Sequence, residues 1–408
     1  MEESRKAGLS LLLEGHAPSD GATLREITVG MDSLTEFIAK QYLDTYIPAG
    51  GSKIKFVTGN PGSGKTHFSG LMLAEAAERN YLTVSFSAKE VWLHDFREVY
   101  LEILRQCDIS RVLKGCAERM VREMGYDPGD IRDGQNFLDM LAERKEGDAL
   151  SKNEIRGLLR RFFTRNPLLD NTFATCCSLL TGGILGHPVL ENSSREMILA
   201  YLHGDRTVKM AQLRAIGLAP SPITKYNARH LLRSLCEVVH MAGYRGLLVV
   251  IDDMEMLLNR NQEDRIHYTK LRREDTYESI RQLIDDIDSM RHVLFLLAFD
   301  RELMDDENMG MKSYQALWMR VQNEIVSTRF NRFADIIDMD RYGDEAYTPE
   351  ILCRMSERLC GVLAGSGIKT HPLTEKEAEA LQERAAFGRL GLPCLMNRMT
   401  LEGGAENG

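Results

Sequence analysis

The sequence has 408 residues, of which 43% are hydrophobic and 27% are charged, and its formal net charge is −9 at pH 7. This composition is ordinary for a folded protein with one large domain or two to three smaller ones. The acidic balance argues against a protein that coats nucleic acid by bulk electrostatics, although a local basic face could still bind it. No run of about 18 apolar residues occurs, so we expect no membrane span.

The start of the chain and its cysteines bear on location. Residues 1–6 are polar, and the apolar stretch at 9–13 is too short for the core of a secretory signal peptide. The eight cysteines include no CxxC pair and no Cys/His cluster at zinc spacing, and only Cys176 and Cys177 are adjacent. In a chain of this size we expect reduced, mostly buried thiols and a cytoplasmic location.

The first part of the chain alternates between helix and strand patterns. A helix is expected at 3–13, followed by a turn rich in glycine and proline, and a second helix is expected at 33–46. A short strand at 54–58 enters a glycine-rich turn, a helix follows at 67–79, and a second strand follows at 81–86.

The rest of the chain begins with a long helical stretch, from about residue 90 to 241. Continuous apolar runs at 247–251 and 292–299 indicate strands that are buried on both faces, as in a parallel sheet. The other expected elements are helices at 277–290 and 313–322, a strand at 333–339, and helices after 342 up to a glycine-rich tail. These alternating elements predict a parallel α/β sheet.

A phosphate-binding loop lies between the first expected strand and the next helix. The pattern Gly59-x-x-x-x-Gly64-Lys65-Thr66 follows a strand and opens a helix, which is the context that a P-loop requires. Glycines let the backbone approach the phosphates, and N–H groups at the helix start present partial positive charge to them. Lys65 is expected to reach the β- and γ-phosphates, and Thr66 offers a hydroxyl to Mg²⁺. The expected nucleotide contacts are Gly59, Asn60, Pro61, Gly62, Ser63, Gly64, Lys65, Thr66 and His67.

The acidic half of the site is expected after the strand at 247–251. Asp252 is the expected carboxylate on the Mg²⁺ side, acting directly or through water. Many ATPases of this kind place a glutamate next to it to orient the attacking water; here that position is Asp253, and Glu255 follows two positions later. Asp253 is one methylene shorter than glutamate, and a displacement of ~1 Å can cost about a hundredfold in rate. Either residue could take this role, or could cap a helix or form a surface ion pair.

Further polar residues follow the later elements. Asp300 ends a strand, where it could contact the γ-phosphate or the water, or cap the next helix. Arg320, Arg329 and Arg332 lie where ring-forming ATPases carry an arginine finger, which adds ~10³–10⁵ to the rate in other nucleotide hydrolases. We favour Arg320 among them as a catalytic residue, and Arg398 could approach the nucleotide from a C-terminal lid. Each of these arginines could instead be a surface residue.

A basic stretch at 155–165 could contact nucleic acid. Helical spacing places Arg156, Arg160 and Phe163 near one face, as a helix that contacts DNA or RNA would require. The alternative, which we favour, is an amphipathic helix with a solvated basic rim.

The spacing of the two halves of the site is unusual. Lys65 and Asp252 lie 187 positions apart, far more than one strand-helix-strand unit needs. A helical insertion within about 108–240 accounts for this distance.

The order of segments resembles the ATP-binding proteins of bacteriophage exclusion (BREX) systems, a group of AAA+-like P-loop ATPases of the BrxC and BrxD type. The similarity spans nearly the whole chain. It is carried by segments 9–30, 56–66, 201–206 (YLHGDR), 228–235 (ARHLLRSL), 243–255 (GYRGLLVVIDDME) and 313–320 (SYQALWMR). The family reads Asp-Glu-x-Glu where this chain has Asp-Asp-Met-Glu at 252–255, and its Pro/Arg-containing C-terminal segment corresponds to 391–398.

The resemblance and the motifs together define the expected protein. We expect an N-terminal helix and linker at 1–30, an AAA+-like ATPase core at 31–340 with the helical insertion, and a small lid-like helical domain at 341–408. The resemblance implies ATP and Mg²⁺ as cofactors, ATP hydrolysis, and a role in bacterial antiviral defence with other proteins of the same system. A homo-oligomer with ATP and a DNA-associated complex are further expectations. The alternatives are a nucleotide-gated adaptor that does not hydrolyse ATP and a DNA-processing ATPase outside defence.

Overall fold

The computed structural model describes residues 21–146, 149–259, 265–322, 330–364, 368–386 and 388–406. Within them, five parallel strands form one sheet in the order β2-β3-β4-β1-β5. The strands are β1 (Ser52–Gly59), β2 (Leu82–Ser87), β3 (Leu247–Asp252), β4 (Val293–Asp300) and β5 (Ile336–Asp338). The expected α/β class with a parallel sheet is therefore confirmed.

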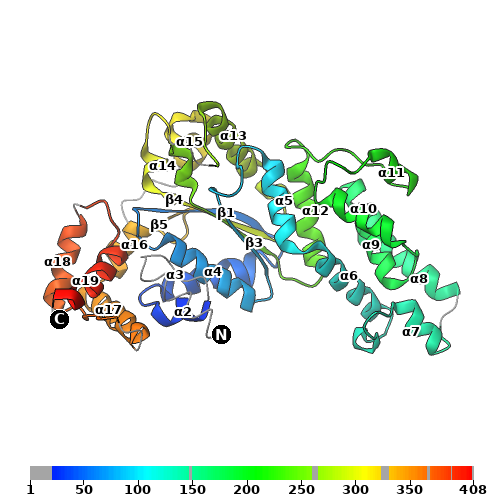
Figure 1. Cartoon of the computed structure of the whole chain (residues 1–408), viewed down its shortest axis with the longest axis horizontal. Coiled ribbons are helices and arrows are strands. Elements are labelled where there is room, and N and C mark those ends of the chain that lie inside the picture. Colours follow the sequence, from blue (N-terminus) through cyan, green and yellow to red (C-terminus); the bar gives the residue numbers. More distant parts are fainter. Residues whose placement is uncertain are drawn as a thin grey trace.

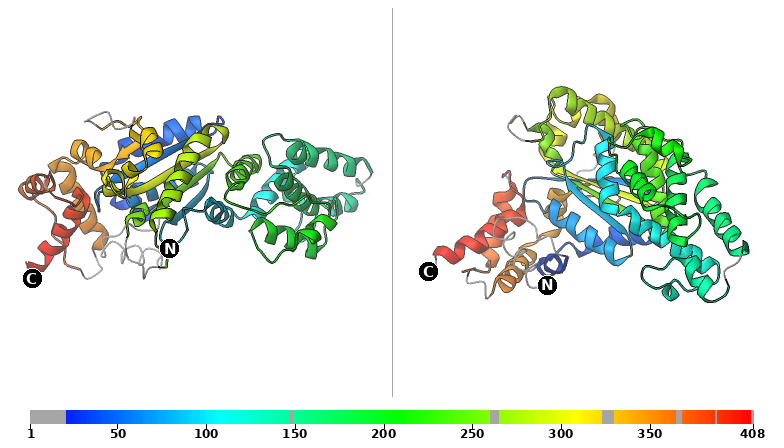
Figure 2. Two further views of the ribbon diagram at one scale, coloured as in Figure 1. Left: turned by 90° about the horizontal axis from the view of Figure 1, so that it is seen from above. Right: turned by 45° about the vertical axis from the view of Figure 1, so that its right-hand side comes forward.

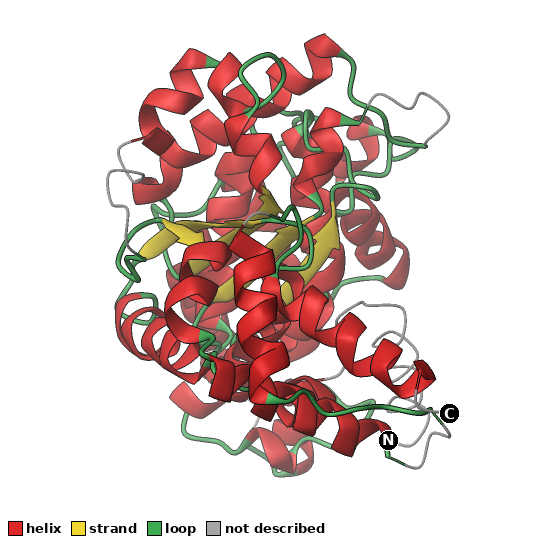
Figure 3. Ribbon diagram, turned by 90° about the vertical axis from the view of Figure 1, so that its left-hand side faces the viewer, coloured by secondary structure: helices red, strands yellow, loops and turns green. Residues whose placement is uncertain are grey.

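The sheet is buried on both faces, which explains the continuous apolar runs of β3 and β4. Successive side chains of a strand point to opposite faces. Phe295 and Leu297 of β4 belong to one hydrophobic cluster, whereas Leu294 and Leu296 belong to the other. Figure 3 shows the sheet between helices on its two sides. A strand in this position has no solvent face, so its sequence does not alternate.

One face of the sheet packs against helices that follow β2, β3 and β4 (Figure 1). They are α5 (Phe96–Cys107), α6 (Ile109–Glu123), α12 (Ala228–Met241), η4 (Met254–Leu258), α13 (Lys270–Asp286), η5 (Ile287–Ser289), α14 (Arg301–Asp305), η6 (Met311–Ser313) and α15 (Gln315–Val321). The helices on the other face are α2 (Gly21–Ile27), α3 (Asp32–Ile38), η1 (Ala39–Tyr46), α4 (Lys65–Glu78) and α16 (Met339–Ala346).

A group of helices between α6 and α12 extends away from the sheet. Its elements are η2 (Pro128–Asp130), α7 (Phe137–Glu143), α8 (Ala149–Leu159), η3 (Arg160–Thr164), α9 (Asn171–Leu185), α10 (Asn192–Leu202) and α11 (Met210–Ala215). The apolar α9 packs against α6, α7, α8, α10 and η3. The described residues between β2 and β3 thus form helices only, as the sequence predicted, and the limits of an insertion domain stay a prediction.

The C-terminal helices lie at the opposite end of the molecule from α8–α11 (Figure 2, left). They are α17 (Pro349–Leu363), α18 (Glu375–Ala386) and α19 (Leu392–Glu406), which pack against one another. The start of α19 lies on the backbone of the glycine-rich loop. The N–H of Gly391 donates to the carbonyl of Pro61 at 2.9 Å, and that of Cys394 donates to the carbonyl of Gly62 at 3.2 Å.

Several expected elements differ in their limits. The expected helix at 3–13 lies outside the described residues. Residues 21–27 form α2, a helix that we did not expect, and Gly30 (φ 80°) provides the turn after it. The helix expected at 33–46 is α-helical only to Ile38 and continues as the π-helix η1. The helix α13 begins seven residues before the expected position, because the Thr269 side chain caps it by accepting from the N–H of Arg272.

The described helices and the cysteines bear on the expectations about membrane spans and thiols. No helix among the described residues is long and apolar enough to span a bilayer. All eight cysteines are free thiols, and Cys176 and Cys177 are both buried.

The contact between α19 and the loop predicts the effect of a side chain at Gly391. A Cβ atom built there would lie 2.4 Å from the Ser63 Cα atom and 2.5 Å from its backbone nitrogen. We therefore expect Gly391→Ala to lower the free energy of unfolding by roughly 1–3 kcal/mol, which a thermal melt would measure. The matched control is Gly361→Ala in α17, where no atom lies within 4 Å of the added Cβ. This substitution within a helix should raise the free energy of unfolding by about 0.5–1 kcal/mol. Equal effects of the two substitutions would contradict the close contact between Gly391 and Ser63.

Two stacked histidines lie at the edge of the sheet opposite the glycine-rich loop, and they predict that the protein loses stability in acid. The rings of His240 and His292 lie 3.7 Å apart at an interplanar angle of 6°, and each Nδ1 donates to a backbone carbonyl. Burial and the neighbouring His240 lower the pKa of His292 to about 4, with Arg291 adding to the effect. Burial also lowers the pKa of His240. The unfolded chain therefore binds more protons below pH 6.5, and stability is lost as the pH falls from there towards 4.

Between pH 7.5 and pH 5, we expect the free energy of unfolding of the wild type to fall by about 1–2 kcal/mol more than that of His292→Asn. Asparagine tolerates the left-handed backbone at this position (φ 58°) and cannot titrate. Urea unfolding at the two pH values measures the difference. An unchanged pH dependence would exclude His292 as its source.

Candidate nucleotide-binding site

The expected phosphate loop lies at the carboxyl edge of the sheet. It leaves β1 at Gly59 and enters α4 at Lys65. Gly62 (φ 76°) and Gly64 (φ 95°) both adopt the left-handed conformation, which favours glycine. A Cβ atom on Gly59 would lie 2.4 Å from Ser63 Oγ, so this position also requires glycine. The glycines of the pattern therefore have the conformational roles that a P-loop gives them.

The Lys65 side chain is buried and folded back onto its own loop. Its Nζ atom lies 2.7 Å from Asp300 Oδ1 and donates to the carbonyls of Gly59 at 3.2 Å and Asn60 at 3.0 Å. These contacts use all three protons of the ammonium group. Asp300 begins α14 but makes no side-chain capping hydrogen bond, so the alternative role as an N-cap is not observed.

Thr66 and Asp252 face each other across β4. The Thr66 hydroxyl donates to Asp252 Oδ2 at 2.8 Å, and the N–H of Asp253 donates to Asp252 Oδ1 at 2.8 Å. Burial is the main cause that raises the pKa of Asp252. A hydroxyl and a carboxylate are ligands that suit Mg²⁺, which usually keeps water and phosphate oxygens as its other ligands. Among the described residues, no group of three or more His, Cys, Asp or Glu side chains could hold a metal ion.

The side chains of Asp253 and Glu255, which follow β3, point in different directions. Asp253 (φ 57°) turns towards β2, where it accepts from the Ser87 hydroxyl at 2.6 Å and pairs with Lys89 at 2.7 Å. The Glu255 carboxylate points to the other side and accepts from the N–H of Asp300 at 3.3 Å. Burial, and then the negative charge of Asp300, raise the pKa of Glu255 to about 7. The two acids therefore have different partners and different charge environments.

The structure adds two residues that the sequence analysis missed. The Asp340 carboxylate accepts from the loop N–H of Asn60 at 2.9 and 3.1 Å. Arg301 donates to Asp340 at 3.0 and 3.1 Å and to Asp338 at 2.5 Å. Arg301 directly follows Asp300 at the end of β4, and Asp340 comes two positions after β5. These positions after strand ends could have indicated both residues as part of the site.

His67 lies one residue beyond Thr66 and contacts the segment before α3. Its Nε2 atom lies 2.8 Å from the Thr28 hydroxyl, and burial lowers its pKa to about 4. The ring is therefore neutral near pH 7.

Some of these residues, from the loop, the start of α4 and the end of β3, line a pocket of about 470 Å³ between the sheet, the segment at 27–31 and the C-terminal helices. Its lining residues are Ile27, Thr28, Val29, Met31, Gly62, Gly64, Lys65, Thr66, His67, Lys89, Asp252, Asp253, Tyr347, Met355, Leu359, Pro393, Cys394, Met396 and Asn397. A pocket with a polar end and an apolar wall suits a ligand that joins phosphates to a flat base.

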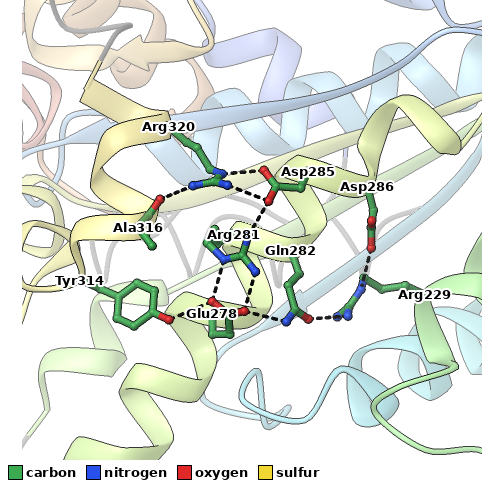
Figure 4. Close-up of polar contacts among 9 residues, drawn as sticks. All are labelled: Arg229, Glu278, Arg281, Gln282, Asp285, Asp286, Tyr314, Ala316 and Arg320. Atoms are coloured by element: carbon green, nitrogen blue, oxygen red, sulfur yellow. Dashed lines mark hydrogen bonds and ion pairs between the residues drawn. The ribbon is translucent and has the colours of Figure 1, made fainter.

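Arg320 does not line this pocket. Its guanidinium group contacts both carboxylate oxygens of Asp285 at 2.5 and 2.8 Å and donates to the carbonyl of Ala316 at 2.6 Å. Figure 4 shows it in a polar network that joins α12, α13 and α15 through Glu278 and Arg281. Within one chain, this arginine therefore contacts α13 rather than the nucleotide site, and a role in a neighbouring subunit stays a prediction.

The other expected arginines have different surroundings. Arg332 is exposed, with its guanidinium 4.9 Å from the centre of the Phe37 ring, and Arg329 lies outside the described residues. Arg398 is exposed on α19 and is not among the lining residues, whereas Asn397 is.

The basic stretch at 155–165 forms the end of α8 and η3. Phe162 and Phe163 are buried in the hydrophobic core, whereas Arg160 is exposed. Arg156 contacts Asn153 and His187. This arrangement is that of an amphipathic helix with a basic rim.

Comparison with known proteins identifies a family for this chain. The model of the family described as BREX system ATP-binding protein BrxC/D matches residues 2–128 and 135–391. No curated protein and no solved structure matched the chain. Because the match covers nearly the whole chain, including the loop, the acidic turn and Asp300, the protein belongs to the BREX system ATP-binding protein BrxC/D family.

Proposed function

We propose that this protein is an AAA+-like ATPase that couples ATP hydrolysis to assembly or remodelling of an antiviral defence complex. The observation that carries the proposal is the contact between Thr66 at the start of α4 and Asp252 at the end of β3, beside the buried Lys65. The strand order supports it, because β4 lies between β1 and β3 and brings Asp300 next to the loop lysine. Family membership supports ATP as the nucleotide.

The loop would bind the phosphates through its N–H groups, with Lys65 transferring from Asp300 to the β- and γ-phosphates. Thr66 and Asp252 would hold Mg²⁺, directly or through water. When bound, this ion would neutralise charge that develops on the phosphates.

Glu255 is the residue that we propose positions the attacking water. Its carboxylate lies beside Asp300, which itself contacts Lys65, and its pKa near 7 suits a group that accepts a proton at neutral pH. Asp253 would instead hold the segment after β2, through Ser87 and Lys89.

The proposed partners rest on the family, and the proposed oligomeric state rests on the positions of Arg320 and Arg332. Family membership supports other proteins of a BREX system as partners, and a DNA-associated complex is proposed with them. Residues 341–408 would act as a lid, because α17 and α19 contribute to the pocket wall. In a homo-oligomer, Arg320 or Arg332 of one subunit would contact the nucleotide of the next.

Single-turnover hydrolysis tests the proposal. We expect Lys65→Ala to abolish ATP binding. Glu255→Gln should keep ATP binding and slow hydrolysis by about a hundredfold or more, because the water loses its base. Asp253→Asn should slow hydrolysis less, because Asp253 contacts Lys89 rather than the water. Rapid-quench measurement of the first turnover separates these steps from product release.

The alternative is an adaptor that binds ATP without hydrolysing it. In that case the wild type and Glu255→Gln would hydrolyse ATP equally slowly while Lys65→Ala still lost binding. Such a result would exclude the ATPase and leave the nucleotide site intact.

The ion pair between Lys65 and Asp300 leads to a separate prediction. Since this pair must break before Lys65 can reach a phosphate, we expect Asp300→Asn to lower the Kd for ATP roughly three- to tenfold. Isothermal titration measures the affinity. Asp305→Asn is the matched control, because Asp305 lies on the same helix and pairs with Lys312. Weaker ATP binding by Asp300→Asn would show that Asp300 assists binding instead.

A further inference from the structure

The residues that line the pocket are of two chemical kinds. One group is charged or polar and comprises Lys65, Thr66, Lys89, Asp252 and Asp253. The other group is apolar and comprises Ile27, Val29, Met31, Met355, Leu359 and Met396. In a nucleotide whose phosphates bind the loop, the flat base is the least hydrated part, and it would pack against the apolar residues. Polar side chains of the pocket lining can then recognise the base.

Tyr347 is one of these side chains. It is 1% exposed and lines the pocket, and its hydroxyl has no hydrogen-bond partner among the described residues. The ring packs edge-on against the Tyr342 ring, with the two ring centres 6.0 Å apart. The Tyr347 carbonyl accepts from Gln382 at 2.7 Å, so both the ring and the backbone of Tyr347 are held in place. A buried hydroxyl without a partner costs free energy, and a ligand that supplies the partner removes that cost.

His67 is the second, and its hydrogen bonds define its tautomer. The Thr28 hydroxyl donates its single proton to the carbonyl of Leu24 at 2.6 Å. It must therefore accept at its 2.8 Å contact with His67, so the proton of the neutral ring lies on Nε2. The Nδ1 atom is left as an acceptor, and it has no hydrogen-bond partner in the described part of the chain.

We propose that His67 and Tyr347 recognise the base of the nucleotide and that His67 selects adenine over guanine. This proposal rests on the proposed function, because it takes the loop as the phosphate site. The 6-amino group of adenine donates to His67 Nδ1, and the Tyr347 hydroxyl donates to a ring nitrogen of the base. In this position guanine places its 6-oxo oxygen against Nδ1, so that two acceptors face each other.

The polar residues Thr28 and Asn397 also line the pocket, but they do not discriminate between the bases. Thr28 is occupied by Leu24 and His67. The Asn397 amide and the Tyr347 hydroxyl each donate and accept, so they can pair with either purine. Selection therefore depends on the acceptor of His67.

Tyr347→Phe tests the hydroxyl, because it removes one oxygen and keeps the ring. We expect the melting temperature of the nucleotide-free protein to stay the same or rise, since an unpaired buried hydroxyl is lost. The Kd for ATP should rise about tenfold. Tyr244→Phe is the control, because Tyr244 lines a different pocket, and it should leave the Kd unchanged. An unchanged ATP affinity in Tyr347→Phe would overturn the role of the hydroxyl.

A double-mutant cycle tests the histidine. Its two changes are His67→Phe in the protein and loss of the 6-amino group in purine riboside triphosphate. We expect the wild type to bind this analogue about tenfold more weakly than ATP, and GTP at least as weakly, whereas His67→Phe binds ATP and the analogue alike. Equal losses in both proteins would show that His67 does not pair with the amino group.

The outcomes separate this inference from the proposed function. If Lys65→Ala binds ATP as the wild type does, the phosphate site itself is wrong. If Lys65→Ala loses binding but the wild type binds ATP and GTP equally, the nucleotide site stands and base selection is overturned.

Discussion

The end of β4 is the point on which the rest of the site depends. Asp300 pairs with the loop lysine, and the next residue, Arg301, binds Asp340, which accepts from the loop N–H of Asn60. The backbone N–H of Asp300 also donates to Glu255. Because β4 lies between β1 and β3, two consecutive residues can contact both the loop after β1 and the acidic turn after β3. A strand elsewhere in the sheet could not join these parts.

This arrangement holds the loop in shape before nucleotide binds. Two loop carbonyls accept from Lys65, one loop N–H donates to Asp340, and two further carbonyls accept from the start of α19. A loop that is already ordered loses little conformational entropy when phosphate binds, which favours affinity. In the proposed function, the same contacts would oppose binding, because Lys65 would have to leave the carboxylate of Asp300. Binding would then exchange one anion for another at this lysine.

The sequence predicted those features that depend on local pattern. The strands show as apolar runs and the loop shows as glycines at fixed spacing, so the sheet and the residues 59–66 could be placed before the structure was known. Contacts between distant residues could not be predicted. Asp340 meets Asn60 across 280 positions only because β5 lies beside β1, and nothing local to either residue indicates that order. Arg320 differs from both, since its place in the chain suits an arginine finger while within one chain its side chain binds Asp285 on α13.

The pocket is lined by residues far apart in the chain, among them residues within the segments 27–31, 62–67 and 347–397. A ligand that contacts all three stabilises their closed arrangement, by as much as its affinity for that arrangement exceeds its affinity for an open one. The start of α19 already contacts the loop through Gly391 and Cys394, so a change in loop geometry on hydrolysis would reach the C-terminal helices directly. The base would contact the apolar wall of the same helices. In the proposed function, phosphate and base would thus both act on the C-terminal helices, so that a small chemical change at the γ-phosphate could alter the surface that partner proteins meet.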